Sequence, residues 1–338
     1  MRLLRPLLSL RSPAGANARL TTLIFHRVLP QPDPLFPDEV DAARFEVVCR
    51  WVTGLFNVLP LAEAASRLRS GSLPTRAAAI TFDDGYADNH EVALPILQRH
   101  GLHATFFIAT GFLDGGRMFN DSVIEAIRRT ALQHLDLRDL GLGFEAPLPL
   151  VDAAARRAAI ERILGGIKYL PPPRRQAAVD ELTRRCGAAL PSDLMMSTAQ
   201  LQALHRAGMG IGGHTRSHPI LAGLDEASQR DEILGGKRDL EAIVDAPVSL
   251  FAYPNGKPNE DYSAISVRAV RDAGFSAAVS TAWGAASAAT DCFQLPRFTP
   301  WDRSGYRFAL RLLGNFVRPM PEQIRIAFGA EAEPASTS

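Results

Sequence analysis

The sequence predicts an α/β fold with a mainly parallel sheet and helices on both faces, and three observations indicate it. Short apolar runs alternate with helical patterns along most of the 338 residues. The runs are mostly continuous rather than alternating, as expected of strands that are buried on both faces. Several helical patterns close at a glycine, among them Gly71, Gly101 and Gly274.

The elements follow in chain order. Strands are expected over residues 20–26, 77–82, 104–110, 208–214, 248–254 and 275–281, with a further strand-like start at residue 57. Helices are expected over residues 44–56, before Gly71, over 89–101 and over 263–274. Strands separated by helices in this rhythm are typical of a parallel sheet covered by helices.

Between about residues 115 and 198 the rhythm changes. Three helical patterns rich in arginine and alanine occupy this stretch, and Pro171 to Pro173 separate the last two. No expected strand there carries candidate catalytic or metal-binding residues. We therefore expect a helical insertion that covers one end of the sheet, within a main domain over residues 20–318.

The two ends of the chain differ from this domain. Residues 1–19 are basic and leucine-rich like a signal peptide, but Arg5, Pro6 and Arg11 interrupt the apolar stretch, which favours a flexible leader. Residues 319–338 are expected to form a C-terminal helix and a disordered tail. No later stretch approaches the roughly 18 apolar residues of a membrane span. The cytoplasm is therefore expected, with membrane association or export as alternatives.

Composition excludes some classes of function. Lys plus Arg number 37 against 36 for Asp plus Glu, so bulk charge gives no case for nucleic-acid binding. The three cysteines are widely spaced and form neither a zinc knuckle nor a disulfide framework.

Two adjacent carboxylates, Asp83 and Asp84, directly follow an apolar run in "AAAITFDDGYADN". Neighbouring like charges cost free energy unless a cation lies beside them. One interpretation is an ordinary Asp-Asp-Gly turn. The other is a metal site in which one aspartate is a ligand and the other a base.

Two histidines favour the metal site. His214 and His218 lie four residues apart in "GIGGHTRSHPIL", a spacing that places both on one face of a helical turn, where they could hold one ion. With eight histidines in the chain, such a pair also arises by chance. However, both motifs follow predicted parallel strands, at the edge of the sheet where such folds place their active sites.

These stretches resemble a known family. "TFDDG" and "HTRSHP" are similar to the first two motifs of the polysaccharide deacetylases, the NodB-homology or carbohydrate esterase 4 group. "LFAYPNG" resembles their third motif, and "LIFHRVLP" resembles the "YHRV"-type strand of the branch that includes poly-N-acetylglucosamine deacetylases. The resemblance covers about residues 20–300 except the insertion. It implies a distorted (β/α)7 barrel and removal of N-acetyl, or sometimes O-acetyl, groups from a polysaccharide or glycan precursor.

The resemblance also implies roles for particular residues. Asp84, His214 and His218 match the ligands of a divalent metal, usually zinc, with cobalt, nickel, manganese or iron as alternatives. Asp83 matches the general base, which acts as metal-bound water attacks the acetyl carbonyl. The backbone N–H of Asn255 matches the donor that stabilises the resulting oxyanion.

Two departures from the family pattern lead to hypotheses. No late "LxH" histidine is present, so we expect His26 to protonate the leaving amine. A core histidine bonded to a carbonyl is the alternative reading of His26, and His90 is the second candidate acid. Ala252 stands where the third motif usually has an arginine, so we expect Arg297 to hold Asp83, with a surface ion pair as the alternative.

Other residues near the motifs have weaker assignments. Tyr86, Tyr253 and Trp301 either stack on sugar rings or pack at the barrel rim, and Asp121 is a further residue that could reach the mouth. Two rival functions stay open: an inactive carbohydrate-binding protein on the same scaffold, and a related metallohydrolase of C–N bonds. The sugar, its linkage and the oligomeric state also stay open.

Overall fold

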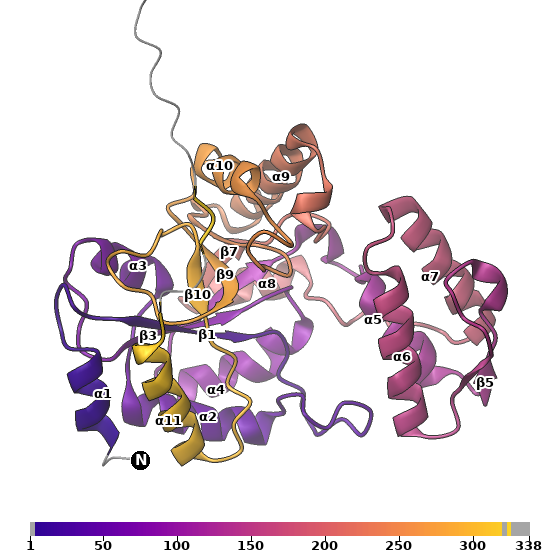
Figure 1. Cartoon of the computed structure of the whole chain (residues 1–338), viewed down its shortest axis with the longest axis horizontal. Helices are drawn as coiled ribbons and strands as arrows, with labels where there is room; N and C mark the ends of the chain where they lie inside the picture. Colours follow the sequence, from indigo (N-terminus) through magenta and orange to yellow (C-terminus); the bar gives the residue numbers. More distant parts are fainter. Residues whose placement is uncertain (1–3, 320–322, 326–338) are drawn as a thin grey trace, which may run out of the picture.

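The computed structural model describes residues 4–319 and 323–325, and a parallel barrel is its centre (Figure 1). Seven strands follow one another around the barrel: β1 (Leu20–Phe25), β3 (Ala77–Phe82), β4 (Thr105–Ile108), β7 (Gly210–Gly213), β8 (Leu250–Ala252), β9 (Ala277–Trp283) and β10 (Leu295–Arg297). A parallel bridge from Leu23 to Phe298 brings β10 back to β1. The prediction of an α/β fold with a distorted seven-stranded barrel is confirmed.

The strands form because their side chains are apolar on both faces. Every residue of β1, β3, β4 and β8 is buried. The strand-like start at residue 57 is the short β2 (Asn57–Val58), which pairs with the beginning of β3. β10 was not among the expected strands, because it is only three residues long and has a proline at its centre.

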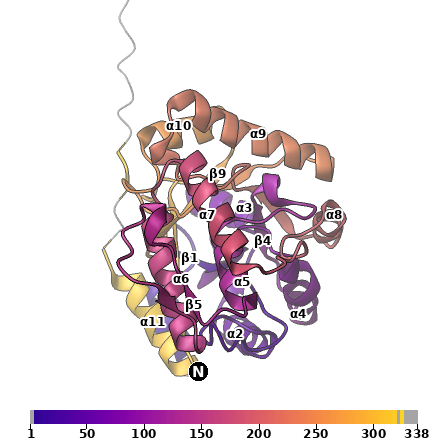
Figure 2. The ribbon, with the colours of Figure 1, turned by 90° about the vertical axis from the view of Figure 1, so that its right-hand side faces the viewer.

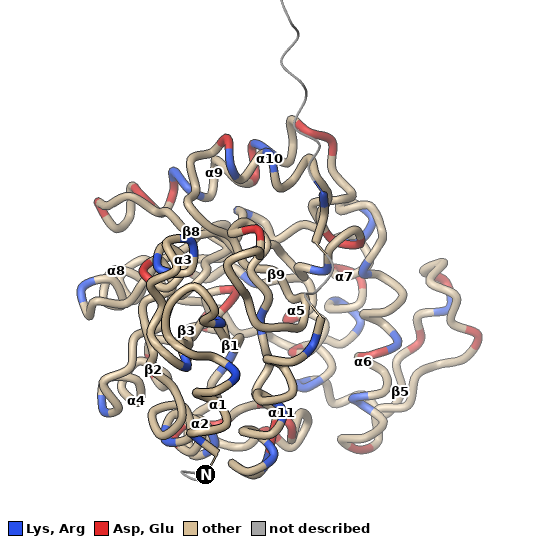
Figure 3. Tube along the Cα trace, turned by 60° about the vertical axis from the view of Figure 1, so that its left-hand side comes forward, with Lys and Arg blue, Asp and Glu red and all other residues tan. Residues whose placement is uncertain are grey.

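Helices surround the barrel. They are α2 (Ala42–Leu55), α3 (Leu61–Arg69), the π-helical turn η2 (Asn89–Ala93) continued by α4 (Leu94–Arg99), α8 (Thr198–Arg206), α9 (Glu226–Val244), α10 (Ala264–Asp272) and α11 (Gly305–Val317). Of these, α2, α3, α4 and α10 lie where the sequence predicted, whereas α8 and α11 were not among the expected helices. Helix α9 was not expected, because Gly235 and Gly236 interrupt its pattern. Basic and acidic positions are interspersed over these helices and the insertion (Figure 3).

The first described residues are more ordered than we expected. Helix α1 (Arg5–Arg11) packs against α11, and the Leu8 side chain is fully buried in the main core. Residues 5–11 therefore form a packed helix where we expected a flexible leader, and the Ser9 hydroxyl, which accepts a hydrogen bond from Arg76, adds a polar contact to the apolar one. The predicted helix and tail over 319–338 lie almost wholly outside the described residues. Among the described helices, none has the length and apolar character needed to cross a membrane.

The insertion forms a lobe beside the barrel (Figures 1 and 2). It contains α5 (Phe119–Arg129), α6 (Ala153–Ile167), α7 (Pro172–Cys186) and a small antiparallel pair, β5 (His134–Leu135) with β6 (Leu148–Pro149). Val123, Ile163 and Leu182 belong to its own apolar core. Among the contacts that attach it to the barrel loops, Arg128 donates to both carboxylate oxygens of Asp33 at 2.8 and 2.6 Å, and Asp114 accepts from the N–H of Thr198 at 2.8 Å.

Candidate active site

The carboxyl ends of the barrel strands bring the predicted site residues to one edge. Asp83 and Asp84 directly follow β3, and His214 directly follows β7. His26 follows β1, and Arg297 is the last residue of β10. Because all the barrel strands are parallel, these ends meet at the same mouth of the barrel.

Asp84, His214 and His218 form a compact cluster. The Oδ1 atom of Asp84 lies 3.4 Å from the Nε2 atoms of both histidines. One potential ligand atom from each of the three residues lies within 4.8 Å of the other two. The side chains of Asp84 and His214 are almost fully buried.

Two observations indicate that this cluster fits a divalent cation. The buried Oδ1 of Asp84 accepts no hydrogen bond from any residue in the described part of the chain, and such an atom is costly without a partner. The Nδ1 of His214 lies 2.7 Å from the carbonyl oxygen of Ala252. When Nδ1 donates to that carbonyl, Nε2 presents its lone pair toward Asp84, as in a metal-ligating histidine. One carboxylate and two imidazoles are a donor set that suits zinc and leaves positions open.

The electrostatics of the cluster also favour a cation. Burial would raise the pKa of Asp84, but the imidazoles of His214 and His218 outweigh it and lower that pKa. Burial lowers the pKa of His218 to about 4, which keeps its ring neutral near pH 7. Burial also acts to lower the pKa of His214, yet the carboxylates of Asp84 and Asp83 raise it overall. The field that favours a proton on His214 would equally favour a metal ion.

The loops that present these residues have unusual backbone angles. Asp84, Thr215, His218 and Asn255 have φ values of +76°, +64°, +52° and +58°, in the left-handed region that residues with a Cβ seldom adopt. Helix α9 packs closely on the histidine loop: a Cβ added at Gly236 would meet the carbonyl oxygen of Thr215 at 2.8 Å. The glycine pair that obscured α9 in the sequence thus allows the helix to support this loop.

Asp83 lies beside the cluster and contacts Arg297. The guanidinium donates two hydrogen bonds of 2.7 Å to the two carboxylate oxygens, and both side chains are nearly inaccessible. Its Nε also donates to the carbonyl oxygen of Ser280 at 2.9 Å, which fixes the fork. Burial alone would raise the pKa of Asp83, but Arg297 lowers it below the usual range. The alternative of a surface ion pair does not fit this buried contact.

His26 lines a hollow of about 240 Å³ together with Asp84, Tyr86 and Asp121. Its side chain is exposed, which does not fit the alternative of a core histidine. Asp121, from the insertion, accepts a hydrogen bond of 3.0 Å from the Tyr86 hydroxyl, and burial raises its pKa to about 7. Asp121 of the insertion therefore lies at the mouth of the barrel.

The remaining aromatic candidates lie elsewhere. Tyr253 is fully buried and stacks on Tyr262 with ring centroids 3.9 Å apart, so the hypothesis that it stacks on sugar is wrong. Trp301 is half exposed and lies against Trp283, away from the lining of the hollows around Asp84. His90 is also absent from those linings.

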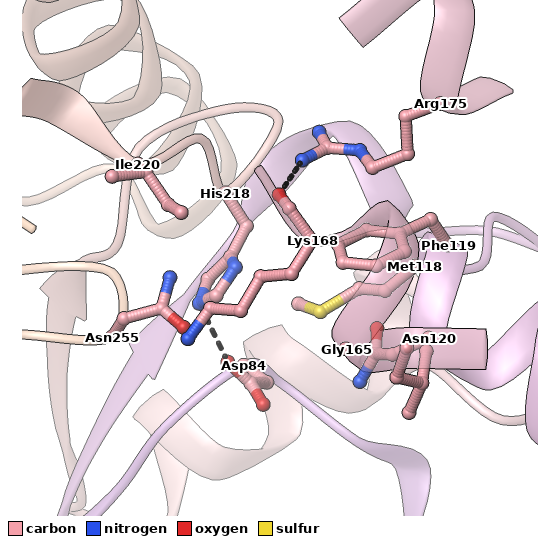
Figure 4. Close-up of a pocket in the computed structure, with 11 residues that line it drawn as sticks. Asp84, Met118, Phe119, Asn120, Gly165, Lys168, Arg175, His218, Ile220 and Asn255 are labelled. Carbon is pink, nitrogen blue, oxygen red and sulfur yellow. Dashed lines mark hydrogen bonds and ion pairs between the residues drawn. The ribbon is translucent and has the colours of Figure 1, made fainter. Parts of the chain in front are cut away.

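A second hollow, of about 250 Å³, lies on the other side of Asp84 and is called the central hollow here (Figure 4). His218 and Asn255 line it from the barrel. The sequence did not indicate the residues of its opposite wall, which come from the insertion: Met118, Phe119, Asn120, Leu164, Lys168 and Arg175. They lie in arginine- and alanine-rich helices without a motif, so no sequence signal distinguished them.

Comparisons with known proteins indicate a family and a fold. A family model described as polysaccharide deacetylase matches residues 70–134 and 178–278. YxkH of Bacillus subtilis, named as a candidate polysaccharide deacetylase, is 21% identical over 282 residues, covering 83% of this chain and 71% of that protein.

Solved structures show the same fold. The deacetylase PplD of Streptococcus pyogenes, solved with acetate, has a TM-score of 0.59 at 18% identity and covers 89% of this chain and 99% of its own. IcaB from Ammonifex degensii has a TM-score of 0.54 at 17% identity and covers 88% of this chain and 97% of its own. The insertion interrupts the family match between residues 134 and 178, where its core lies.

Proposed function

The chain belongs to the polysaccharide deacetylase family, and on that premise we propose that it is a metal-dependent hydrolase that removes N-acetyl groups, or O-acetyl groups, from a polysaccharide or glycan precursor. One observation carries the proposal. Asp84, His214 and His218 converge within 4.8 Å, and an arginine-held Asp83 lies directly beside them. A binding protein without catalysis has no need of this combination.

In the proposal, Asp84, His214 and His218 hold the divalent ion, zinc first among the candidates. The ion would supply Lewis acidity, which acidifies a water molecule and polarises the acetyl carbonyl. The donor set supports this assignment, because it combines one oxygen and two nitrogen ligands and leaves positions open.

Asp83 acts as the general base. It follows β3 next to the ligand Asp84 and lies within hydrogen-bond distance of Arg297, which favours its ionised form. An ionised carboxylate beside the cluster takes the proton of the attacking water. Arg297 is a positioning residue, since both of its outer nitrogens are committed to the oxygens of Asp83.

The remaining roles fall to residues on the walls. The backbone N–H of Asn255, at the edge of the central hollow, donates to the carbonyl oxygen as it gains negative charge. His26, exposed in the adjoining hollow with Asp84, gives a proton to the leaving amine. Its exposure supports this role, because the proton is replaced from solvent between turnovers.

Acetate release tests the proposal. Zinc-loaded protein incubated with N-acetylated chitooligosaccharides should release acetate, a chelator should reduce release to background, and added zinc should restore it. The reason is that the ion held by the three ligands would supply the Lewis acidity that the proposed reaction needs. A tandem assay with an O-acetylated chromogenic ester separates N- from O-deacetylation.

Two other outcomes would replace the proposal. Glycan binding with no acetate release under zinc, cobalt, nickel, manganese and iron would indicate an inactive carbohydrate-binding protein. Release of formate or opening of a cyclic imide, without acetate release, would indicate a related metallohydrolase of C–N bonds.

A further inference from the structure

The central hollow is part of a longer groove between the barrel and the insertion. It shares Asp84 and Asn120 with the His26-lined hollow on one side. On the other side it shares Lys168, Arg175 and Ile220 with an outer hollow of about 290 Å³. The groove therefore extends in both directions from Asp84, which gives room for sugars on each side of the one that reacts.

The two arms of this groove differ in charge. On the His26 side, carboxylates outnumber cations, and Arg128 pairs with both Asp33 and Glu125. In the central and outer hollows, Lys168 and Arg175 are the lysine and arginine of the lining, and the sole carboxylate of that lining is Asp84. One arm thus carries an excess of carboxylates, and the other carries an excess of positive charge.

Lys168 and Arg175 have no acidic partner in residues 4–319 and 323–325. Neither belongs to any ion pair there, although Arg128, Arg129 and Arg185 of the same insertion all do. Arg175 instead donates to the carbonyl oxygen of Lys168 at 3.2 Å, and its guanidinium carbon lies 4.3 Å from the centroid of the Phe119 ring.

Arg175 is partly buried, and no carboxylate among the described residues lies beside it. Burial lowers the pKa of Arg175, and no carboxylate acts to raise it. A partly desolvated guanidinium is stabilised when an anion binds against it, and its planar fork matches the two oxygens of a phosphate or carboxylate.

Figure 4 shows how the two side chains are aimed. Lys168, at the C-terminal end of α6, extends across the central hollow toward His218 and Asn255. Arg175 reaches into the same hollow from the first turns of α7. Both cations, which are half-buried, therefore line the hollow next to the place of the reacting sugar.

We propose that Lys168 and Arg175 form a subsite for an oxyanion, a phosphate or a carboxylate, carried by the glycan next to the acetylated sugar. The inference deepens the proposed function, on which it rests for the identity of the ligand as a glycan. A neutral glycan would leave both cations without a counter-charge in a hollow that is otherwise mostly apolar. The chain thereby selects acetylated glycans that carry negative charge over neutral ones.

Affinity for charged and neutral probes tests this subsite. Zinc-loaded full-length protein is titrated with neutral chitotriose, N-acetylglucosamine 1-phosphate and a hyaluronan tetrasaccharide, and acetate is assayed in the same mixtures. KM replaces Kd for any probe that is hydrolysed. We expect at least one anionic probe to bind about 10-fold or more tightly than chitotriose, since bonds to charged groups are the stronger ones. Preference for the phosphate sugar alone identifies a phosphate, and preference for hyaluronan alone a carboxylate.

Matched variants separate the subsite from general effects. The double variant Lys168→Gln/Arg175→Gln should lose the preference while binding chitotriose as before. Arg174→Gln changes the same charge one residue away, on an exposed side chain outside the groove lining, and should keep the preference. No preference in the native protein, a preference that survives the double variant, or an equal loss for chitotriose would each overturn the subsite.

The same mixtures keep this inference distinct from the proposed function. Charge-selective binding that depends on Lys168 and Arg175, without acetate release from any probe, would leave the subsite standing and remove the deacetylase activity. Acetate release without charge selectivity would support the deacetylase activity and remove the subsite.

Discussion

Replacing Asp83 with Asn is expected to lower kcat by about 10²- to 10⁴-fold, the range for loss of a positioned general base. The amide keeps the shape of the carboxylate but cannot take a proton from water. KM should change little, because Asp83 is buried beneath the groove and does not line it. Initial rates of acetate release over a range of substrate concentrations give both constants.

A matched control addresses folding. Asp302 is also a buried carboxylate paired with an arginine, since Arg311 donates to it at 2.6 Å, and it lies outside the groove. Asp302→Asn breaks a similar pair and should retain kcat. If Asp83→Asn keeps more than a tenth of native kcat while bound zinc and circular dichroism are unchanged, Asp83 is not the base.

Removing the guanidinium with Arg297→Ala is expected to reduce the free energy of unfolding by about 3–5 kcal/mol, since it leaves a buried carboxylate without its partner. The side chains of Asp83 and Arg297 are only 3% and 0% exposed, so water cannot replace the lost hydrogen bonds. We also expect kcat to fall more than KM rises, because the base loses its orientation. Denaturant unfolding and initial-rate kinetics measure the two effects.

Three further variants separate charge, geometry and simple truncation. Arg297→Lys keeps the positive charge but loses the paired hydrogen bonds of the guanidinium, so its kcat should lie between those of Arg297→Ala and the native protein. The double variant Asp83→Asn/Arg297→Met removes both charges and should be more stable than Arg297→Ala alone. Arg303→Ala breaks an exposed ion pair with Asp38 and should have little effect. Unfolding of Arg297→Ala at the native midpoint, with native kcat, would contradict the assigned role.

The barrel and the convergence of Asp84, His214 and His218 could be predicted from sequence because their signals are local. Continuous apolar runs mark strands buried on both faces, and the polar residues that follow those runs must meet at one edge of a parallel sheet. Asp84, His214 and His218 belong to two short motifs, so their convergence follows once the two strands share a sheet. Arg297 was inferred differently, from the absence of an arginine at Ala252.

The groove could not be predicted because it depends on long-range packing. Its second wall is set by how the insertion attaches to the barrel, through contacts such as Asp33 with Arg128, 95 residues apart. Lys168 carries no signal of its own in the sequence, and its role emerges only opposite His218. Helices α1 and α9 were missed for related reasons: contacts with distant residues hold the short α1, and α9 tolerates two glycines where it packs on a loop.

Anomalous scattering from crystals soaked in zinc tests the central claim most directly. The account predicts one strong peak within coordinating distance of Asp84, His214 and His218, about 2.0–2.2 Å from each ligand atom, with Asp83 beside the ion and still paired to Arg297. A principal peak at another place, or these three side chains directed away from one another around it, would contradict the account.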